Sequence, residues 1–228
     1  MATQKKVSLS PVIASVDAVI FTIEDGELKV LLIKRTNTPF KNSWALPGGF
    51  IHKSETSLDA TKRVLHEKAG IKNVYIEQLY TFDRLGRDPR GQVFSISYFA
   101  FVRREQIKFS QDNKIQSPHF FSVNKLPKLA FDHGEIIKYA LKRIGAKLEY
   151  TNIIYALLPN VFMFSQLQNV YEAVWNKKLD KRNFRKKFMS LKLIKPLKKK
   201  LSGLRQRPAE LFIFVSKKPL ELKKFFQN

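Results

Sequence analysis

The stretch from Gly49 to Ile71, GFIHKSETSLDATKRVLHEKAGI, constrains the fold of this chain more than any other. Its second half predicts an amphipathic helix, because apolar and small residues recur in it at helical spacing. We expect the buried face of this helix to consist of Leu58, Thr61, Leu65 and Ala69. Gly70 is typical of a helix C-terminus, where glycine readily adopts the left-handed conformation. An extended segment broken by Pro47 and Gly48 precedes the helix.

The neighbouring segments predict several strands and one further helix. SVDAVIFTI and LKVLLIKR flank EDGE, so Asp25-Gly26 marks a hairpin turn between two strands. VYIEQLYTF and QVFSISYFAFV are expected to be strands on either side of a loop that contains GRDPRG. GEIIKYALKRI is expected to be a closing helix. Strands and helices mixed in this order predict an α+β fold in which helices cover a sheet.

The spacing of several residues in the first stretch follows a known pattern. The matching residues, preceded by LPGG, are Gly49, Glu55, Arg63, Leu65, Glu67, Gly70 and Ile71. In these positions the chain resembles the Nudix box, G-x5-E-x7-R-E-U-x-E-E-x-G-U, in which U is an aliphatic residue. The resemblance covers most of residues 12–146. It implies an α/β/α sandwich and a ligand of the nucleoside-diphosphate-X type.

Two acidic residues of that box are absent. Three glutamates hold magnesium in Nudix hydrolases, and they map onto Val64, Glu67 and Lys68 here. Positions three and four apart share one helical face, which lets a helix offer several oxygen ligands to a hard cation. An apolar group and an ammonium occupy two of these positions, so we expect no metal, no cofactor and no catalytic residue. Arg63 and Glu55 are still expected to pair and to hold the loop against the helix.

Net charge divides the chain into two parts. The whole chain carries a formal charge of +23, and residues 151–228 alone hold 18 Lys or Arg against four acidic residues. We therefore expect a Nudix-like effector-sensing domain over residues 1–149 and a separate domain over residues 150–228. A charge of this size indicates a polyanionic partner, most naturally nucleic acid, although a general basic bias is the alternative.

Two helices joined by a short turn are expected at the start of the basic part. The first is expected to begin with Ser165 as its N-cap and Gln168 in a capping box, with Phe164 as a hydrophobic staple. The second is expected to begin at Asp180. Its buried side is expected to consist of Phe184, Phe188 and Leu191. Two extended segments then enclose a turn at Ser202-Gly203, and this order predicts a winged helix-turn-helix.

The exposed side of the second helix is almost wholly cationic, which predicts that it enters the major groove of duplex DNA. From this helix we expect contacts by Lys181, Arg182, Asn183, Arg185 and Lys186. From the hairpin we expect contacts by Lys198, Lys199, Lys200, Arg205 and Arg207. The Lys and Arg side chains can bind phosphates, and the side-chain amide of Asn183 can form hydrogen bonds with a base edge. The alternative is a solvated charge run on a small helical domain.

The basic part resembles the C-terminal domain of the Nudix-related transcriptional regulators in ALLPNVFMFSQLQNVYE, LDKRNFRKKF and LRQRPAELFIF. YTFDRLGRDPRG and LAFDHGEI in the first part resemble the same family. The resemblance implies a homodimeric repressor that binds double-stranded operator DNA and senses ADP-ribose or a related NAD metabolite. Many members of this family have damaged catalytic boxes, so the departures at Val64 and Lys68 are consistent with membership. A branch of the same architecture senses pentoses such as arabinose, so the effector stays open.

In the Nudix part we expect the effector to contact Trp44, Arg84, Arg87, Asp88 and Glu67. The indole ring of Trp44 can stack on a base, and the guanidinium group of Arg87 can bind a phosphate with two parallel hydrogen bonds. Core packing explains Trp44 equally well, and Arg84 and Arg87 are also explained as loop charges.

Two other functions compete with a regulator. One is an ADP-ribose hydrolase in which Glu67 acts with Glu55 and Glu135, and the other is an RNA-binding Nudix protein. No apolar run is long enough to span a membrane. The chain has no cysteine, which is compatible with a reducing cytoplasm, where we expect the protein to act.

Overall fold

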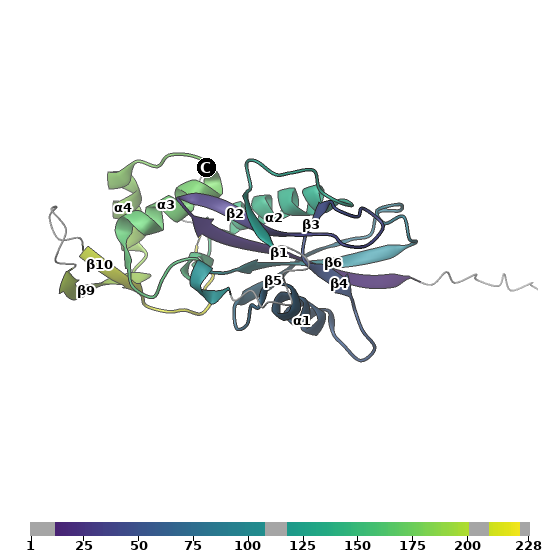
Figure 1. The fold of residues 1–228 in the computed structure, drawn as a ribbon. Coiled ribbons are helices and arrows are strands. Elements are labelled where there is room, and N and C mark those ends of the chain that lie inside the picture. The colour runs from purple at the N-terminus through teal and green to yellow at the C-terminus, as the bar shows by residue number, and fades with distance from the viewer. Residues whose placement is uncertain (1–11, 108–117, 201–209, 224–228) are drawn as a thin grey trace, which may run out of the picture.

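The computed structural model describes residues 12–107, 118–200 and 210–223. Two parts lie side by side along the long axis of the molecule (Figure 1). The elements of the first part are β1 (Ile13–Glu24), β2 (Glu27–Lys34), β3 (Trp44–Ala45), β4 (Gly48–Phe50), α1 (Ser57–Ala69), β5 (Tyr75–Phe82), β6 (Val93–Phe101), η1 (Arg104–Gln106), β7 (His119–Ser122) and α2 (His133–Lys147). The elements of the second part are η3 (Ile153–Ala156), β8 (Phe162–Met163), α3 (Phe164–Trp175), α4 (Lys181–Ser190), β9 (Ile194–Lys200) and β10 (Glu210–Phe214).

A mixed sheet forms the centre of the first part. Its strand order is β3-β2-β1-β6-β5, with β4 pairing β1 and β7 pairing β2. β1 runs antiparallel to β2 and parallel to β6. The turn between β1 and β2 falls at Asp25 and Gly26, whose φ angles are 55° and 76°. The predicted hairpin is confirmed, because both turn residues have the positive φ that a tight antiparallel connection requires.

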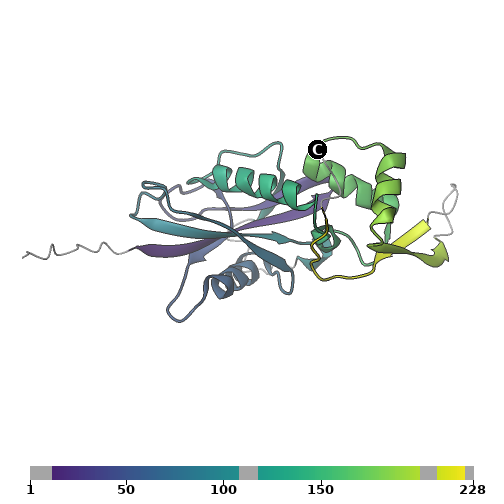
Figure 2. The ribbon, with the colours of Figure 1, turned by 180° about the vertical axis from the view of Figure 1, so that it is seen from behind.

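Helices α1 and α2 cover opposite faces of this sheet (Figure 2). Along β1, Val19 and Phe21 belong to the hydrophobic cluster that includes α2. Ala18 and Ile20 belong to the cluster that includes α1. Because side chains alternate between the faces of a strand, a strand covered on both sides is apolar throughout. The predicted α/β/α arrangement is therefore the observed one.

Helix α1 begins and ends as expected but buries a slightly different face. The hydroxyl of Thr56 accepts a hydrogen bond from the backbone N–H of Asp59, and Gly70 ends the helix with a φ of 64°. The buried residues are Ala60, Thr61, Val64, Leu65 and Ala69. Leu58 was expected among them but is 38% exposed. It lies in the first turn, before the part of α1 that packs on the hydrophobic clusters of the described residues.

The second part is a helix pair packed on a three-stranded sheet of order β8-β10-β9. The side chain of Asp180 caps α4 by accepting from the backbone N–H of Asn183, as predicted. Phe184 and Phe188 are buried as predicted, whereas Leu191 is only half-buried at the end of the helix. The predicted turn at Ser202-Gly203 lies outside the described residues.

The predicted N-terminus of α3 is wrong by two residues. The helix is capped at Met163, whose backbone N–H donates to the side-chain oxygen of Gln166 at 2.8 Å. Gln168 instead donates to Glu172 at 2.8 Å, further along the helix. Phe164 lies within the helix and is buried, since it packs on Phe184 and on strand β10.

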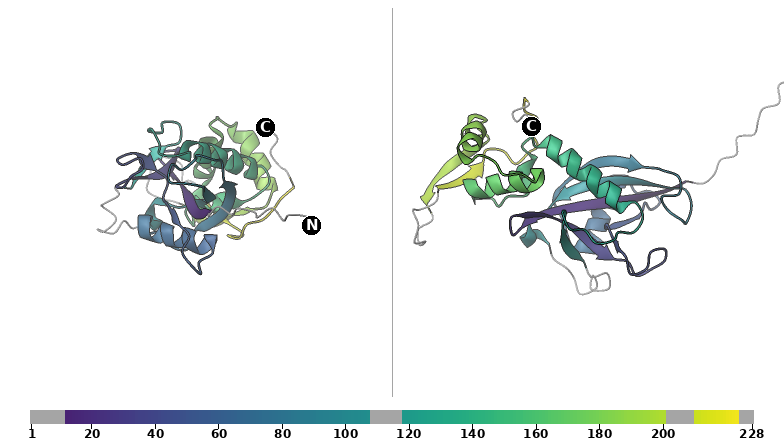
Figure 3. Two further views of the ribbon diagram at one scale, coloured as in Figure 1. Left: turned by 90° about the vertical axis from the view of Figure 1, so that its right-hand side faces the viewer. Right: turned by 90° about the horizontal axis from the view of Figure 1, so that it is seen from above.

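The two parts share a continuous core. One hydrophobic cluster runs from Val19 in β1 through Ile144 in α2 to Phe188 in α4. Viewed from above, α2 leads from the sandwich to the helices of the second part (Figure 3). Near the end of α2 the indole N–H of Trp175 donates to the carbonyl oxygen of Gly145 at 3.0 Å.

The segment after β10 returns to the junction between the parts. The amide of Asn152 donates to the carbonyl oxygen of Lys218 at 3.0 Å and accepts from the backbone N–H of Leu220 at 2.7 Å. Asn152 is only 1% exposed, so these bonds satisfy a buried amide. The boundary expected between residues 149 and 150 falls at this junction and stays a prediction. Among the described residues, no helix combines the length and apolar character needed to cross a membrane.

Candidate functional site

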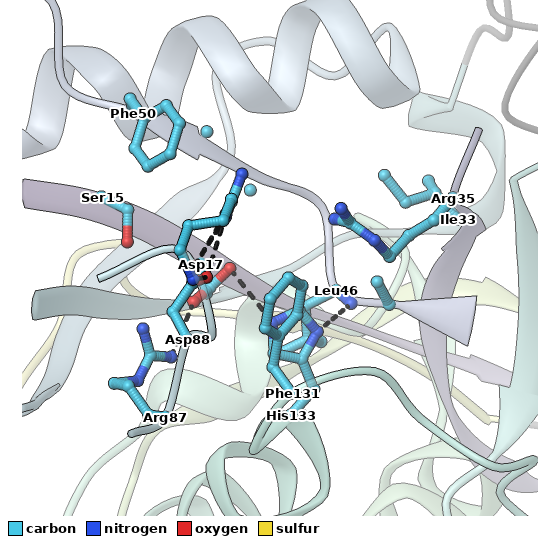
Figure 4. Close-up of a pocket in the computed structure, with 14 residues that line it drawn as sticks. Ser15, Asp17, Ile33, Arg35, Leu46, Phe50, Arg87, Asp88, Phe131 and His133 are labelled. Atoms are coloured by element: carbon cyan, nitrogen blue, oxygen red, sulfur yellow. Dashed lines mark hydrogen bonds and ion pairs between the residues drawn. The ribbon is translucent and has the colours of Figure 1, made fainter. Parts of the chain in front are cut away.

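A pocket lies in the first part, where β1, β2 and β4 meet the loop before α2 (Figure 4). Its cavity volume is about 150 Å³. The residues that line it are Ser15, Asp17, Ile33, Arg35, Ala45, Leu46, Gly48, Gly49, Phe50, Arg87, Asp88, Arg90, Phe131 and His133. The pocket thus combines three guanidinium groups and two carboxylates with two aromatic rings.

A buried ion pair forms one wall of the pocket. Arg87 donates two parallel hydrogen bonds to Asp132, from Nε at 2.9 Å and from Nη2 at 2.7 Å. The same Nη2 lies 3.5 Å from Asp17, which accepts a hydrogen bond of 2.6 Å from Ser95. Although burial opposes ionisation, the two carboxylates keep the pKa of Arg87 above its ordinary value. Arg87 is therefore a fixed positive charge that holds the start of α2 against β1.

His133 is held in one tautomer. Its Nδ1 accepts a hydrogen bond of 2.8 Å from the backbone N–H of Leu46. Its Nε2 therefore carries the proton of the neutral ring and points to Asp17, 3.5 Å away. Burial lowers the pKa of His133, because the charged ring would lose its hydration. The histidine is thus a neutral link between β1, the loop after β3 and helix α2.

A second wall is cationic and aromatic. The guanidinium carbon of Arg35 lies 4.7 Å from the ring centre of Phe131. Arg90 lies 5.6 Å from the same ring and 4.9 Å from that of Phe50. Asp88 is buried and accepts hydrogen bonds from Arg90 Nε at 2.9 Å and from Nη2 at 2.6 Å. Phe131 has a φ of 52°, an uncommon conformation for an aromatic residue, and its surroundings hold it there.

The structure separates the predicted effector residues into two groups. Arg87 and Asp88 line the pocket. Trp44 lies beside it, with its ring 4.8 Å from that of Phe121. Arg84 pairs with Glu135 at 3.3 Å on the surface, and both are 65% exposed. Glu67 is exposed on α1 and pairs with Arg63 at 3.4 Å. A role in effector binding stays a prediction for all five.

Several pocket residues escaped the sequence analysis, namely Asp17, Arg35, Arg90, Phe131 and His133. One signal for them was present, since Asp17 is a lone carboxylate within an otherwise apolar strand. A charge in that position must find a buried partner. The sequence did not reveal which distant residue that partner would be.

The helix of the Nudix-like box keeps its structural contacts. Arg63 donates to Glu55 from Nε at 2.7 Å and from Nη2 at 3.0 Å, as predicted. Hydrogen bonds from Arg63 and from the backbone of His52 lower the pKa of Glu55 to about 2. Val64 is 1% exposed, and its Cγ2 would lie 3.3 Å from a Cβ added to Gly49. An apolar side chain thus fills the space beneath the pocket loop.

The same helix does not assemble a group of possible metal ligands. Among the described residues, no three His, Asp or Glu side chains gather in a way that could hold a metal ion. Lys68 is half-buried on the helix, and the preceding residue, Glu67, is exposed. Glu55, the acid that precedes the helix in the Nudix-like box, is paired with Arg63.

Helix α4 presents a cationic surface. Lys181, Arg182, Asn183 and Lys186 are exposed, on the side away from Phe184 and Phe188. Arg185 differs from the others, because it pairs with Glu210 at 2.7 Å and lies 4.8 Å from the ring of Phe164. It joins α4 to strand β10, so any contact with DNA would compete with this role.

The predicted hairpin residues are only partly described. Lys198, Lys199 and Lys200 belong to strand β9, which pairs with β10. Arg205 and Arg207 lie outside the described residues. Contacts of these five residues and of α4 with DNA stay predictions.

Comparisons with known proteins agree with both parts of the fold. Residues 14–140 match the NUDIX domain, and residues 154–214 match the NrtR DNA-binding winged helix domain. A protein of Acinetobacter baylyi, the ADPR responsive transcriptional repressor NtrR, is 32% identical over 223 residues, which are 94% of this chain and 86% of that protein. The chain belongs to the NrtR family. The predicted fold class, a Nudix sandwich followed by a winged helix, is confirmed.

A solved structure of this family covers both parts. NrtR of Shewanella oneidensis, crystallised with a 27mer DNA, has a TM-score of 0.77 and 33% identity, over 88% of this chain and 93% of that one. Its Nudix domain, crystallised with ADP ribose, has a TM-score of 0.53 and 34% identity, over 62% of this chain and 94% of that one.

The sandwich is also similar to an enzyme. An ADP-ribose pyrophosphatase of Methanocaldococcus jannaschii is 42% identical over 130 residues, which are 57% of this chain and 73% of that protein. This likeness covers little more than half of the chain, whereas the NrtR relatives are similar along nearly the whole chain.

Proposed function

We propose that this NrtR-family protein is a transcriptional repressor that binds operator DNA through its winged helix and senses ADP-ribose in the pocket of its Nudix part. The observation that carries the proposal is that one continuous core joins the part that holds a charged pocket to the part that holds an exposed cationic helix. The DNA and ADP-ribose complexes of the Shewanella relative support it. We further propose that it acts in the cytoplasm as a homodimer, the state that suits a two-fold operator.

DNA binding is tested by fluorescence anisotropy on an operator-length duplex. Arg182→Ala and Lys186→Ala should each weaken binding by about 1–3 kcal/mol, because an exposed cation of α4 is lost at the groove. Lys142→Ala is the matched control, since it removes one exposed cation from α2, outside the winged helix. Equal effects of all three substitutions would mean that α4 has no special role, and stronger binding to single-stranded RNA would favour the RNA-binding alternative.

The second part of the proposal is that the protein binds ADP-ribose without hydrolysing it. Val64 is packed in an apolar environment and Lys68 puts an ammonium where the Nudix box has a glutamate, which supports the absence of a magnesium site. Incubation with ADP-ribose and magnesium should yield no turnover above background. Turnover that disappears in Glu67→Gln would show instead that the chain is a hydrolase, like its Methanocaldococcus relative.

A further inference from the structure

Arg185 differs in its surroundings from the other cations of helix α4. Arg182 and Lys186 are exposed, whereas Arg185 is half-buried. Its guanidinium carbon lies 4.8 Å from the ring centre of Phe164 and 5.4 Å from that of Phe212. Both rings are buried, so the guanidinium lies against the aromatic core of the second part, where cation–π attraction holds it.

The charge of Arg185 is matched by Glu210 in strand β10. Its Nη2 donates a hydrogen bond of 2.7 Å to Oε2 of Glu210. Phe212 comes two positions further along β10, so its ring and the carboxylate lie on the same face of the strand. One guanidinium therefore joins α4 to α3 through Phe164 and to β10 through Glu210 and Phe212.

The ion pair lies at the start of β10. Glu210 is the first residue of this strand and pairs in register with Lys200, the last residue of β9. Helix α4 and strands β9 and β10 lie together at the end of the molecule far from the sandwich (Figure 1). Since a winged helix binds DNA with its helix and its hairpin, the angle between them decides whether both reach one duplex.

An acidic residue at this place opposes DNA binding by its charge. Residues 151–228 hold 18 Lys or Arg and four acidic residues, of which Glu210 is one. A carboxylate beside the cations of α4 repels the phosphate backbone. The pair also adds little to stability, because both of its side chains are partly exposed. What the pair supplies is a fixed orientation of α4 against β10.

We propose that Arg185 is a positioning residue, whose ion pair with Glu210 sets the angle between α4 and β10 so that helix and hairpin bind one duplex together. The inference rests on the proposed function and gives Arg185 a role other than direct contact with DNA. Its Nη2 is used by Glu210 and its guanidinium lies against two rings. Arg182 and Lys186, on the side away from the core, are left to meet the DNA.

Fluorescence anisotropy of the full chain on an operator-length duplex tests this role, because positioning and direct contact predict opposite signs for one substitution. If Arg185 bound DNA directly, loss of the Glu210 charge would free it and tighten binding. If the pair positions α4, Glu210→Gln should instead weaken binding roughly 3- to 10-fold. Glu221→Gln is the matched control, because it removes an exposed carboxylate of the same part that has no ion pair among the described residues. It should leave binding unchanged or slightly tighter.

Reversal of the pair supplies a rescue. Arg185→Glu alone should weaken binding on the order of 10- to 100-fold. Combining it with Glu210→Arg restores the ion pair at the wild-type net charge and should regain at least about 3-fold in affinity, while the ring contacts stay lost. Circular dichroism should show that all variants are folded.

Unchanged or tighter DNA binding of Glu210→Gln would overturn the positioning role. A double reversal that binds as weakly as Arg185→Glu would overturn it as well. Absence of duplex binding by the wild type would instead overturn the proposed function itself.

Discussion

Gly48 shows how closely the pocket wall is packed at the scale of one residue. A Cβ at this position would overlap Oδ1 of Asp17 and lie 2.7 Å from the carbonyl oxygen of Val16. Both atoms belong to β1, which pairs with β4 at this point and cannot move away without breaking the sheet. Glycine is therefore required here for close approach of two strands.

Gly48→Ala should lower the free energy of unfolding by about 1–3 kcal/mol, the usual cost of overpacking a rigid site. The measurement is urea unfolding followed by circular dichroism. Gly134→Ala in α2 is the control, because its Cβ would meet only Leu129 Cδ1, at 4.0 Å. It should leave stability unchanged or raise it slightly, since alanine favours a helix. Equal losses in both variants would contradict the packing argument.

His133 should make stability depend on pH. Its folded pKa lies below the ordinary value of 6.5, so the unfolded chain takes up a proton first as the pH falls. Stability contributed by the neutral ring is thus fully present above about pH 6.5 and is lost as the pH falls towards the lowered folded pKa.

Denaturant unfolding between pH 7.5 and about 5 measures this dependence. In His133→Gln the curve of stability against pH should be flatter than in the wild type. His66→Gln, which changes an exposed histidine of α1, should leave the wild-type curve unaltered. Parallel curves for the wild type and His133→Gln would show that another group causes the dependence.

The residues of the Nudix-like box could be predicted because they lie within one short stretch of sequence, from the loop before α1 to the end of that helix. The pair of Arg63 with Glu55 was expected from the positions of the box, and the structure confirms it. The pocket could not be predicted in this way. His133 meets the backbone of Leu46 across 87 positions of sequence, and Arg87 meets Asp132 across 45. Such contacts depend on the sheet order, which residue spacing does not reveal.

Elements were predicted more reliably than their ends. The long strands and the two helices expected in the sandwich have strong apolar patterns and were found where they were expected, whereas the short strand β7 was not expected. The cap of α3 was misplaced because Ser165 and Gln168 have the spacing of a capping box. The observed box is formed by Met163 and Gln166, which lie two residues earlier. Burial of Phe164 against the second part's aromatic core shifts the helix start, and that tertiary effect is invisible in the local pattern.

Helix α2 connects the two proposed binding sites. Its first residue, His133, lines the pocket, and Gly145 near its end accepts the hydrogen bond from Trp175 in α3. A ligand that shifts the start of a rigid helix also shifts its end, so α2 is the element through which we expect ADP-ribose to influence DNA binding.

Trp175→Phe should leave the affinity for ADP-ribose and the affinity for DNA alone nearly unchanged, because it keeps an aromatic ring while losing the hydrogen bond. The change in DNA affinity that saturating ADP-ribose causes should shrink by about 0.5–2 kcal/mol. Anisotropy titrations with and without ADP-ribose give this coupling free energy. An unaltered coupling would assign the transmission to other contacts.

At the scale of the whole molecule, the shared core predicts that both parts unfold together. The chain has two tryptophans, Trp44 in the first part and Trp175 in the second, so Trp175→Phe and Trp44→Phe each leave one local fluorescent reporter. Both variants should give coincident thermal transitions, because a continuous hydrophobic cluster crosses the junction. Circular dichroism of the same samples gives the midpoint of overall unfolding for each variant. Fluorescence midpoints that differ clearly between the two variants would show that the two parts unfold independently.

The return of the segment around Lys218 to Asn152 has a consequence for the order in which the protein is made. The ribosome synthesises the sandwich first, and the last helix of the sandwich ends at Lys147. The partners of the Asn152 amide are synthesised almost seventy residues later, since 66 and 68 positions separate them. The junction therefore closes only after Leu220 has been synthesised, and a chain broken off before Lys218 would carry a finished sandwich joined to an unsecured winged-helix part.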